Sequence, residues 1–472
     1  MGSASADDDR RRPHVALVAF PFGTHAAPLL ALARALASSR SGAAAAATFS
    51  FLGTARSLAS LRGGCDQVPD LRVVAIPEGG EGEGDGEEEE MRQIGRFAAA
   101  AEAGGIREGL RAAAAAAAAE VSCVVSDAFV WAAGDAAEEI GAPWVPLWTG
   151  GPHSLATHLR GDLLRSTFGL GPQAMEDHGD DPLDFVPGLS GHHRVRDLPE
   201  GIIFGPLDDP IAVILSCMAD RLLRRPPTAA ALVLNTFLGF DPTADAAFAS
   251  EFDHYLPVGP LHLLADPPHP LADPDPSNCL SWLDQHPPAS AAYVGFGTVA
   301  MPPPAELAAL AKGLELSRAP FVWSLKESAQ ELLPPGFSDR VRANGTGLVV
   351  SWAPQKAVLG HAVVGAFVSH CGWNSVLESV AAGVPMVCRP IFGDQRMNAR
   401  AVESVWGIGV ALRGGIAAEE VVAGALDVVL RGEEGRRMRE RAREIKAKAA
   451  AATGVGGSSS ENLKKLLKLV CG

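Results

Sequence analysis

The sequence lacks the motifs of several large enzyme classes. Its seven cysteines are scattered, odd in number and form no CxxC pair, so they offer no zinc site and predict reduced thiols. No GxxxxGK[ST] motif is present, which excludes a Walker-type nucleotide triphosphatase. No GxGxxG follows the first predicted strand of either half, which argues against a nicotinamide dinucleotide. Positive charge is also scarce, with 40 Lys and Arg against 55 Asp and Glu, so nucleic acid and anionic membranes are poor partners.

Long apolar runs are missing as well. The N-terminus is polar and reaches no apolar core of signal-peptide length, and the alanine-rich runs are short and interrupted by charge. We therefore expect no membrane span, a cytoplasmic location and a monomer. The composition is globular, because 47% of the 472 residues are hydrophobic and only 20% are charged. This length predicts two domains.

Short apolar runs alternate with helical patterns along the whole chain. In the first half, strands are expected at residues 15–20, 48–53, 121–127, 142–148 and 232–237, the last of them closing that half. In the second half, they are expected at residues 291–298, 320–325, 347–352, 364–370 and 385–390. Residues 29–39 and 304–317 have helical spacing. This alternation predicts an α/β fold with two Rossmann-like domains, which face each other across a cleft.

Composition also indicates the domain boundaries. A proline-rich stretch at 264–278 is typical of a linker. We expect an N-terminal domain over residues 1–255, a linker over 256–278, a C-terminal domain over 279–455, and a final helix over 456–472 that packs back on the first domain. The Gly- and Glu-rich stretch at 77–90 cannot bury a core and is expected to be a surface loop.

Polar residues gather where the strand at 364–370 passes into a helix. His370, Asn374 and Ser375 are expected at the carboxyl end of the strand and the amino end of the helix. Backbone N–H groups and the helix dipole favour an anion there, so these side chains suit a diphosphate. The spacing from Ser375 to Glu378 also fits a capping box, which requires no ligand. This stretch alone leaves both interpretations open.

The flanking sequence carries a family resemblance. Residues 352–395, which read WAPQKAVLGHAVVGAFVSHCGWNSVLESVAAGVPMVCRPIFGDQ, resemble the signature of plant family 1 UDP-sugar glycosyltransferases almost position by position. Stretches such as AFPFGTHAAPLL, SDAFVW and FGDQRMNAR resemble the flavonoid and anthocyanidin 3-O-glucosyltransferase subgroup. The resemblance implies a GT-B fold. It also implies inverting transfer of glucose from UDP-glucose to a hydroxyl of a flavonol or anthocyanidin, without a metal or other cofactor.

The resemblance implies a donor site in the second half. Trp352 would stack on uracil, although a buried strand-end tryptophan is the structural alternative. Gln355 and Glu378 would bind the ribose hydroxyls. The other positions matched to UDP are Thr298, Ala353, His370, Gly372, Asn374 and Ser375. Those matched to the sugar are Thr149, Trp373, Asp394 and Gln395, and glutamine at this last position favours UDP-glucose over UDP-galactose.

The resemblance also implies a catalytic pair in the first half. His25 is expected in the turn after the first strand and Asp127 at the end of another, and carboxyl ends of parallel strands meet at one edge of a sheet. An imidazole, with an ordinary pKa of about 6.5, suits a general base for a phenolic hydroxyl, and a carboxylate can fix its tautomer. A structural role for both residues is the alternative. The Asp-x-Asp at 273–275 is interrupted by Pro274 and predicts no metal site.

The acceptor side is less specified. Positions matched to acceptor contacts are Gln93, Phe129, His158 and Phe392, each of which could instead be a core residue. Gly23 and Gly295 stand where relatives usually have serine, and a lost hydroxyl removes a hydrogen bond of roughly 0.5–1.5 kcal/mol. The same chemistry on another phenolic, terpenoid or hormone acceptor stays open. So does a UDP-sugar-binding protein that does not catalyse.

Overall fold

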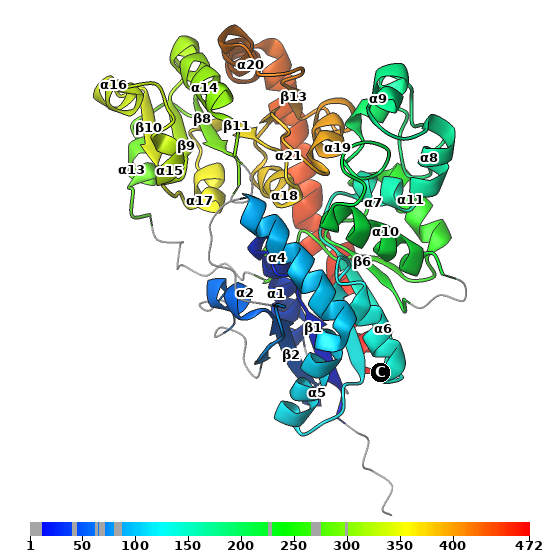
Figure 1. Ribbon diagram of the computed structural model, residues 1–472. Helices are drawn as coiled ribbons and strands as arrows, with labels where there is room; N and C mark the ends of the chain where they lie inside the picture. The colour runs from blue at the N-terminus through cyan, green and yellow to red at the C-terminus, as the bar shows by residue number, and fades with distance from the viewer. Residues whose placement is uncertain are drawn as a thin grey trace, which may run out of the picture.

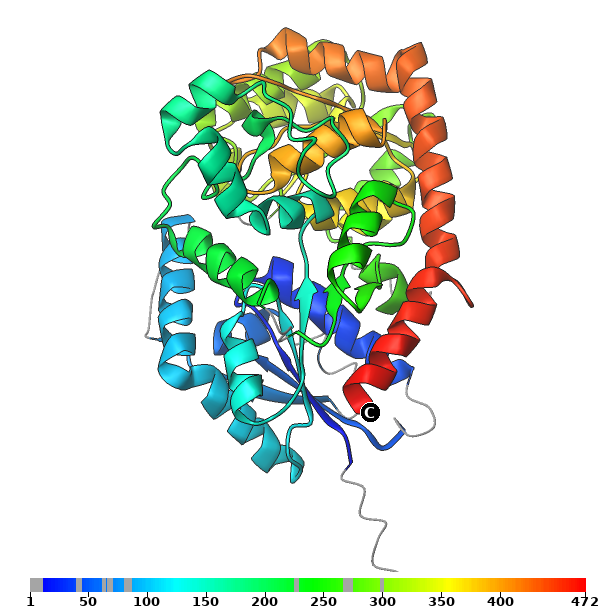
Figure 2. The ribbon, with the colours of Figure 1, turned by 90° about the vertical axis from the view of Figure 1, so that its right-hand side faces the viewer.

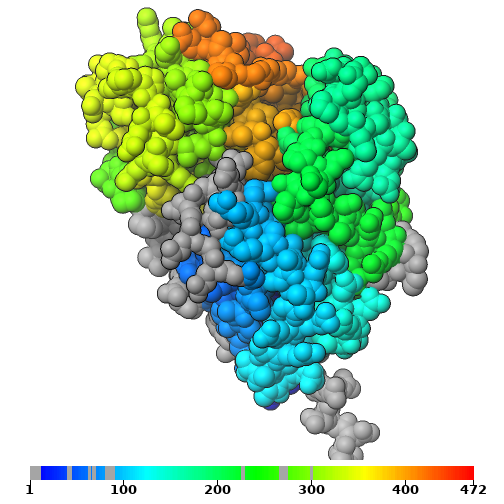
Figure 3. Space-filling view, viewed as in Figure 1, coloured from blue at the N-terminus to red at the C-terminus, as the bar shows by residue number. Residues whose placement is uncertain are grey.

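The computed structural model describes residues 12–39, 45–61, 65, 71–79, 87–224, 229–265, 275–297 and 301–472. They form two α/β domains that lie against each other (Figure 1). In the space-filling view, the part of the C-terminal domain drawn in orange lies directly against the part of the N-terminal domain drawn in green (Figure 3). The predicted fold class, two Rossmann-like domains, is confirmed.

The N-terminal domain is built on a seven-stranded parallel sheet with the order β3-β2-β1-β4-β5-β6-β7. Its strands are β1 His14–Val18, β2 Thr48–Gly53, β3 Leu71–Ala75, β4 Cys123–Asp127, β5 Trp144–Trp148, β6 Leu232–Leu234 and β7 Tyr255–Pro257. Its helices are α1 Gly23–Ser38, α2 Ala55–Ser60, α4 Glu87–Ala100, α5 Ile106–Ala117, α6 Ala132–Glu139, α7 Pro152–His158, α8 Gly161–Phe168, α9 Pro172–His178, α10 Pro210–Leu222, α11 Pro242–Glu251 and α12 Leu261–Ala265. Strands β1, β4 and β5 are buried along their whole length, which explains their continuous apolar runs.

The C-terminal domain has a six-stranded parallel sheet with the order β10-β9-β8-β11-β12-β13. Its strands are β8 Ala291–Gly295, β9 Phe321–Ser324, β10 Gly347–Val350, β11 Val364–Ser369, β12 Met386–Cys388 and β13 Gly409–Ala411. Its helices are α13 Cys279–Leu283, α14 Pro304–Ser317, α15 Glu327–Gln330, α16 Phe337–Ala343, α17 Gln355–Gly360, α18 Trp373–Ala382, α19 Gln395–Arg400, α20 Glu419–Arg431 and α21 Glu433–Thr453. In both sheets the strand order reverses beside the first strand, where open α/β sheets place their ligands.

The last helix, α22 Ser458–Cys471, returns to the N-terminal domain. Figure 2 shows α21 running along one side of the molecule and α22 ending against the first domain. Leu463, Leu466 and Leu467 belong to the apolar cluster that contains β1 and α1. The hydroxyl of Ser459 donates to the carbonyl of Gly259, and the amide of Asn462 donates to that of Pro257.

Several sequence-based boundaries need correction. Strand β6 does not close the first half, because β7 pairs with it, and the helix α12 packs on α1, so 256 is too early for the start of a linker. Residues 266–274 lie outside the described residues. Helix α4 begins at Glu87, so the expected loop at 77–90 ends before its last four glutamates, and residues 80–86 also lie outside the described residues.

Candidate active site

A cavity of about 750 Å³ lies between the two domains. It is lined by residues that follow β1 and β5 in the first sheet, and by the carboxyl ends of β8 and β11 in the second. The matched residues that line it are His25, Phe129, Thr149, His158, Trp352, Ala353, Gln355, His370, Gly372, Trp373, Asn374, Ser375, Glu378, Phe392, Asp394 and Gln395. Thr298 lies outside the described residues.

The side chains of His25 and Asp127, which are predicted to act as a catalytic pair, are in contact. The Oδ2 atom of Asp127, which is fully buried, lies 2.9 Å from Nδ1 of His25. The other carboxylate oxygen accepts the N–H of Phe129 at 2.9 Å. Because Nδ1 of His25 is engaged by the carboxylate, Nε2 is the ring nitrogen left for a group in the cavity.

His25 lies in the first turn of helix α1, not in a turn before it. The sequence-based expectation began the helix at residue 29, after Pro28. Pro28 has no N–H for the carbonyl of Thr24, four residues earlier, and the amide of Asn374 in the other domain donates to that carbonyl at 2.8 Å. The proline thus leaves an acceptor that ties α1 to the start of α18.

Thr149 contacts both His25 and Asp127. Its Oγ1 lies 2.9 Å from Nδ1 of His25 and 3.1 Å from Oδ2 of Asp127. The resemblance matched this residue to the sugar, whereas its hydroxyl here contacts both members of the pair. The ring of Phe129 lies 4.6 Å from the imidazole, centroid to centroid, which walls it from solvent on that side.

The junction between β11 and α18 is the corner at which the sequence predicts an anion site. Its turn has a positive φ of 66° at Cys371, and a Cβ on Gly372 would lie 2.5 Å from Nε2 of His370, so only glycine fits there. Burial lowers the pKa of His370 to about 4, which makes the imidazole neutral near pH 7. In the part of the chain that the structure describes, its Nδ1 has no hydrogen-bond partner.

The capping-box interpretation of this corner is wrong. Gly372, not Ser375, precedes the first residue of α18, and no side chain caps the helix. The Oε2 atom of Glu378 instead accepts the amide of Gln355 at 2.6 Å, and that amide also lies 3.3 Å from the hydroxyl of Ser375. The phenol of Tyr293 donates to Oε1 of Gln355 at 3.2 Å. These side chains form one polar wall, which suits ribose hydroxyls.

Trp352 stands at the edge of this wall. Its side chain is 45% exposed, which removes the alternative of a core tryptophan. Ala353, which follows it in the chain, is buried at the cavity wall. A large exposed indole beside a polar wall is suited to stack on a nucleobase.

The residues matched to the sugar are held tightly. Oδ2 of Asp394 accepts the N–H of Gly151 at 3.1 Å and the amide of Asn398 at 3.0 Å, and burial raises the pKa of Asp394. Oε1 of Gln395 accepts the backbone N–H groups of residues 391 and 392, which leaves its NH₂ group as a donor. Trp373 is 4% exposed and donates to the carbonyl of Asn235, so most of its ring packs between the domains.

The acceptor side of the cavity is largely apolar. Phe129, His158 and Phe392 line it, and burial lowers the pKa of His158 to about 3. Gln93 does not line it, because its side chain is turned into the N-terminal domain, where it donates to Glu78. The other lining residues of this part, which sequence reasoning missed, include Met91, Ile94, Pro199, Glu200, Asp209, Ile211 and Leu215.

The two glycines at serine positions differ in their surroundings. No atom lies within 4 Å of a Cβ added to Gly23. A Cβ on Gly295 would lie 3.2 Å from the phenol oxygen of Tyr293 and 3.3 Å from Oε1 of Gln355. The glycine at 295 therefore leaves room for the hydrogen bond between those two side chains.

Neither metal ligands nor a membrane helix were found in the described part of the chain. No three His, Cys, Asp or Glu side chains there are grouped to hold a metal ion. Asp275, from the Asp-x-Asp sequence, accepts the N–H groups of Cys279 and Leu280. None of the described helices is long and apolar enough to cross a bilayer.

The chain is similar to known sugar transferases. A family model described as "UDP-glucoronosyl and UDP-glucosyl transferase" matches residues 82–439. An anthocyanidin 3-O-glucosyltransferase of Zea mays is 50% identical over 97% of both chains. A myricetin 3-O-rhamnosyltransferase of Crocosmia x crocosmiiflora is 49% identical over 98% of this chain and 99% of that one. Among solved structures, a UDP-glucose: anthocyanidin 3-O-glucosyltransferase in complex with UDP is 35% identical and superposes with a TM-score of 0.87, covering 98% of this chain and 99% of that one.

Proposed function

Since the chain belongs to the UDP-glucoronosyl and UDP-glucosyl transferase family, we propose that it transfers glucose from UDP-glucose to the 3-hydroxyl of a flavonol or anthocyanidin. The products are a β-O-glucoside and UDP. The observation that carries this proposal is that His25, which is paired with the buried Asp127, lines the same cavity as the corner before α18. A protein that only bound a UDP-sugar would have no use for such a pair.

The donor is held by the C-terminal domain. The uracil stacks on Trp352, and the ribose hydroxyls bind the wall formed by Gln355 and Glu378. The diphosphate rests at the start of α18, where backbone N–H groups, the hydroxyl of Ser375 and the imidazole of His370 meet it. These groups offset the diphosphate charge, so no metal ion is required in this proposal.

The hexose points toward the N-terminal domain. The carboxylate of Asp394 and the NH₂ group of Gln395 bind its hydroxyls, one as acceptor and one as donor. The anomeric carbon then faces the catalytic pair. A flat aromatic acceptor lies between Phe129 and Phe392, which suits the apolar lining of that part of the cavity.

The transfer is a single displacement. Nε2 of His25 takes the proton of the acceptor hydroxyl as its oxygen bonds to the anomeric carbon, and Asp127 stabilises the resulting imidazolium. The bond from that carbon to the phosphate oxygen breaks on the opposite face, and UDP leaves with the electron pair. Attack from the face opposite the leaving group converts an α-linked donor into a β-glucoside.

An acceptor panel tests the proposal. The protein is incubated with UDP-glucose, UDP-galactose or UDP-rhamnose and with flavonols, anthocyanidins, simple phenols and terpenoid alcohols, and products are identified by mass and nuclear magnetic resonance. We expect a 3-O-glucoside of a flavonoid, which disappears in His25→Ala. Transfer to a non-flavonoid alone, or transfer that His25→Ala leaves unchanged, would contradict it.

We further propose a cytoplasmic monomer. All seven cysteines are free thiols, and six of them are buried, which is consistent with a reducing compartment. The cavity is completed by residues of this one chain, so the proposed chemistry needs no second copy.

A further inference from the structure

A loop of the N-terminal domain holds the turn that carries the sugar-facing residues. We call this turn, which spans residues 391–395, the sugar turn. The carboxylate of Glu200 reaches it from the other domain. One of its oxygens accepts the N–H of Gly393 at 2.8 Å, and the other pairs with the guanidinium of Arg396 at 2.5 Å.

Three successive backbone N–H groups of the sugar turn donate to side chains. Gly393, at its tip, has a positive φ of 62°, which a residue with a side chain rarely adopts. From inside the turn, Oε1 of Gln395 accepts the N–H groups of Ile391 and Phe392. The N–H of Gly393 points the other way and is the one that Glu200 accepts. The turn is therefore fixed from both sides, and one side belongs to the N-terminal domain.

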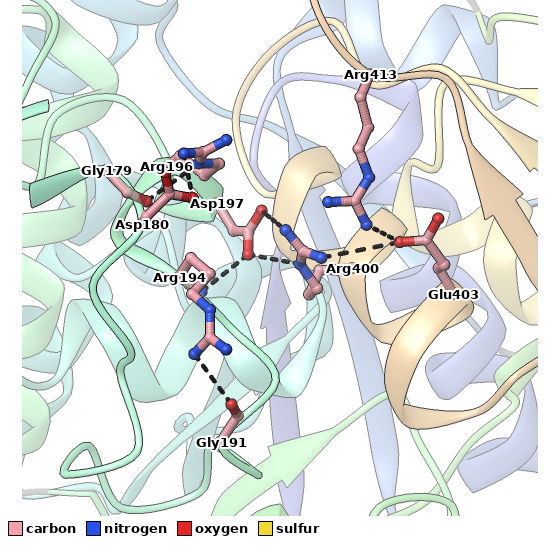
Figure 4. Close-up of polar contacts among 9 residues, drawn as sticks. All are labelled: Gly179, Asp180, Gly191, Arg194, Arg196, Asp197, Arg400, Glu403 and Arg413. Atoms are coloured by element: carbon pink, nitrogen blue, oxygen red, sulfur yellow. Dashed lines mark hydrogen bonds and ion pairs between the residues drawn. The ribbon is translucent and has the colours of Figure 1, made fainter. Parts of the chain in front are cut away.

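A second contact holds the far end of the helix α19, which follows the turn. Both oxygens of Asp197 bind the guanidinium of Arg400, at 2.8 and 3.1 Å. Figure 4 shows this pair in a chain of charges that continues through Glu403 to Arg413. The loop over residues 197–200 thus binds α19 at its end through Asp197 and the turn before α19 through Glu200.

The two contacts differ in where they lie. Asp197 is 10% exposed and Arg400 is 12% exposed, and neither lines the cavity. Glu200 and Gly393 both line the cavity, between Phe392 on one side and Asp394 on the other. A shift of the Gly393 backbone would move the side chains of Phe392 and Asp394, because these two residues flank it in the chain. Glu200 is thus placed to affect the geometry of the site, whereas Asp197 joins the domains outside it.

We propose that Glu200 is a positioning residue for glucosyl transfer, which fixes the sugar turn from the N-terminal domain so that Asp394 meets the hexose and Phe392 meets the acceptor. The inference rests on the proposed function, because it takes the ligand of Asp394 to be a hexose. Glu200 contacts Gly393 and Arg396 at the sugar turn, whereas the polar wall of Gln355 and Glu378 is built on α17 and α18. It should therefore influence the sugar and not the nucleotide.

Comparing the affinities for UDP-glucose and UDP tests this assignment. In Glu200→Ala, calorimetric titration should show UDP-glucose binding weakened about tenfold, the size expected for a lost charge-assisted hydrogen bond, with UDP binding within about twofold of the wild type. Glu200→Gln can still accept the N–H of Gly393 but cannot pair with the charge of Arg396. It should weaken UDP-glucose binding only about threefold, so it reports on the same contact if the alanine variant folds poorly.

Two control variants separate positioning from general loss of an ion pair. Glu251 pairs with Arg160 at 2.7 Å inside the N-terminal domain, with 18% of its side chain exposed, so Glu251→Ala removes a comparable pair away from the site. Asp197→Asn weakens the contact outside the cavity. Both should leave the ratio of the two affinities at the wild-type value, with thermal midpoints recorded for all variants.

The outcomes are distinct. If Glu200→Ala keeps the wild-type ratio, or if Asp197→Asn lowers it as much, Glu200 does not position the sugar turn. If the wild-type protein itself binds UDP but shows no added affinity for UDP-glucose and no transfer, the proposed function fails instead. Rescue of the ratio by Glu200→Gln relative to Glu200→Ala supports the hydrogen bond to Gly393.

Discussion

Replacement of Asp127 by asparagine tests the proton path at its most buried point. The side chain is fully buried, and asparagine has nearly its volume, so Oδ1 can still accept the N–H of Phe129. The change falls on Oδ2, which faces Nδ1 of His25 at 2.9 Å. If an NH₂ group replaces that oxygen, it donates to Nδ1 and places the ring proton on Nε2. In that tautomer, Nε2 cannot accept the proton of the acceptor hydroxyl.

Thr149, which contacts both His25 and Asp127, determines how large a loss of kcat we expect. General base catalysis contributes typically 10²–10⁴-fold, and a misplaced tautomer forfeits most of it. The hydroxyl of Thr149 lies 2.9 Å from Nδ1 of His25 and can accept its proton in place of the carboxylate. We therefore expect Asp127→Asn to lower kcat by about 10²–10³-fold, or about 3–4 kcal/mol. Adding Thr149→Val should deepen the loss to about 10⁴-fold, because no acceptor for Nδ1–H then remains.

Initial rates at saturating UDP-glucose, with product followed by chromatography, measure both variants. The dissociation constant for UDP is the control, since neither residue contacts the donor nucleotide in the proposed complex. A loss below about fivefold in Asp127→Asn, with UDP binding intact, would refute the assignment of the pair. A double variant that is no slower than Asp127→Asn alone would refute the role assigned to Thr149.

Three further predictions concern the donor site. Trp352→Ala should weaken UDP binding roughly 5- to 150-fold, which is the equivalent of about 1–3 kcal/mol of base stacking. Because Trp352 is 45% exposed, the thermal midpoint of the protein should not fall. Calorimetric titration measures the affinity, and a melting curve measures the midpoint. Gly23→Ser should keep the affinity for UDP-glucose, because nothing lies within 4 Å of the new Cβ. Gly295→Ser should weaken that affinity, because the new Cβ lies 3.3 Å from Oε1 of Gln355 and crowds it. Equal dissociation constants for the two variants would contradict this prediction. Burial lowers the pKa of His370 from 6.5 to about 4, so the unfolded chain binds the proton first as pH falls. Stability is then lost progressively from about pH 6.5 down to about pH 4, and the thermal midpoint should fall less between pH 7 and pH 5 in His370→Gln than in the wild type.

The central strands of both sheets could be predicted from the sequence, and so could the edge strand β10 Gly347–Val350, which is fully buried. Strands β1, β4, β5 and β11 are buried on both faces, so each is an apolar run bounded by polar residues. The other three edge strands have no such signal. β3 Leu71–Ala75 is mostly half-buried or exposed, and β13 Gly409–Ala411 and β7 Tyr255–Pro257 have three residues each.

In the candidate site, the cluster of polar residues after the strand at 364–370 indicated the corner before α18, and the family resemblance indicated His25 and Asp127 as a pair. It could not predict contacts between distant segments. Thr149 and His25 are 124 residues apart, and Glu200 and Gly393 are 193 apart, so nothing local in the sequence indicates either contact. Gln93 illustrates a different failure. On helix α4, Met91 and Ile94 are spaced to share the face that lines the cavity, and the glutamine between them is turned away from it.

The return of α22 has a consequence for how the protein matures. The helix supplies Leu466 and Val470 to the apolar cluster around β1 and α1, so the first domain shares its core with a segment that follows the whole second domain in the chain. During synthesis, the part of the β1–α1 cluster that α22 covers stays exposed while the second domain is being made. The N-terminal domain can therefore complete its core only after the second domain has been synthesised.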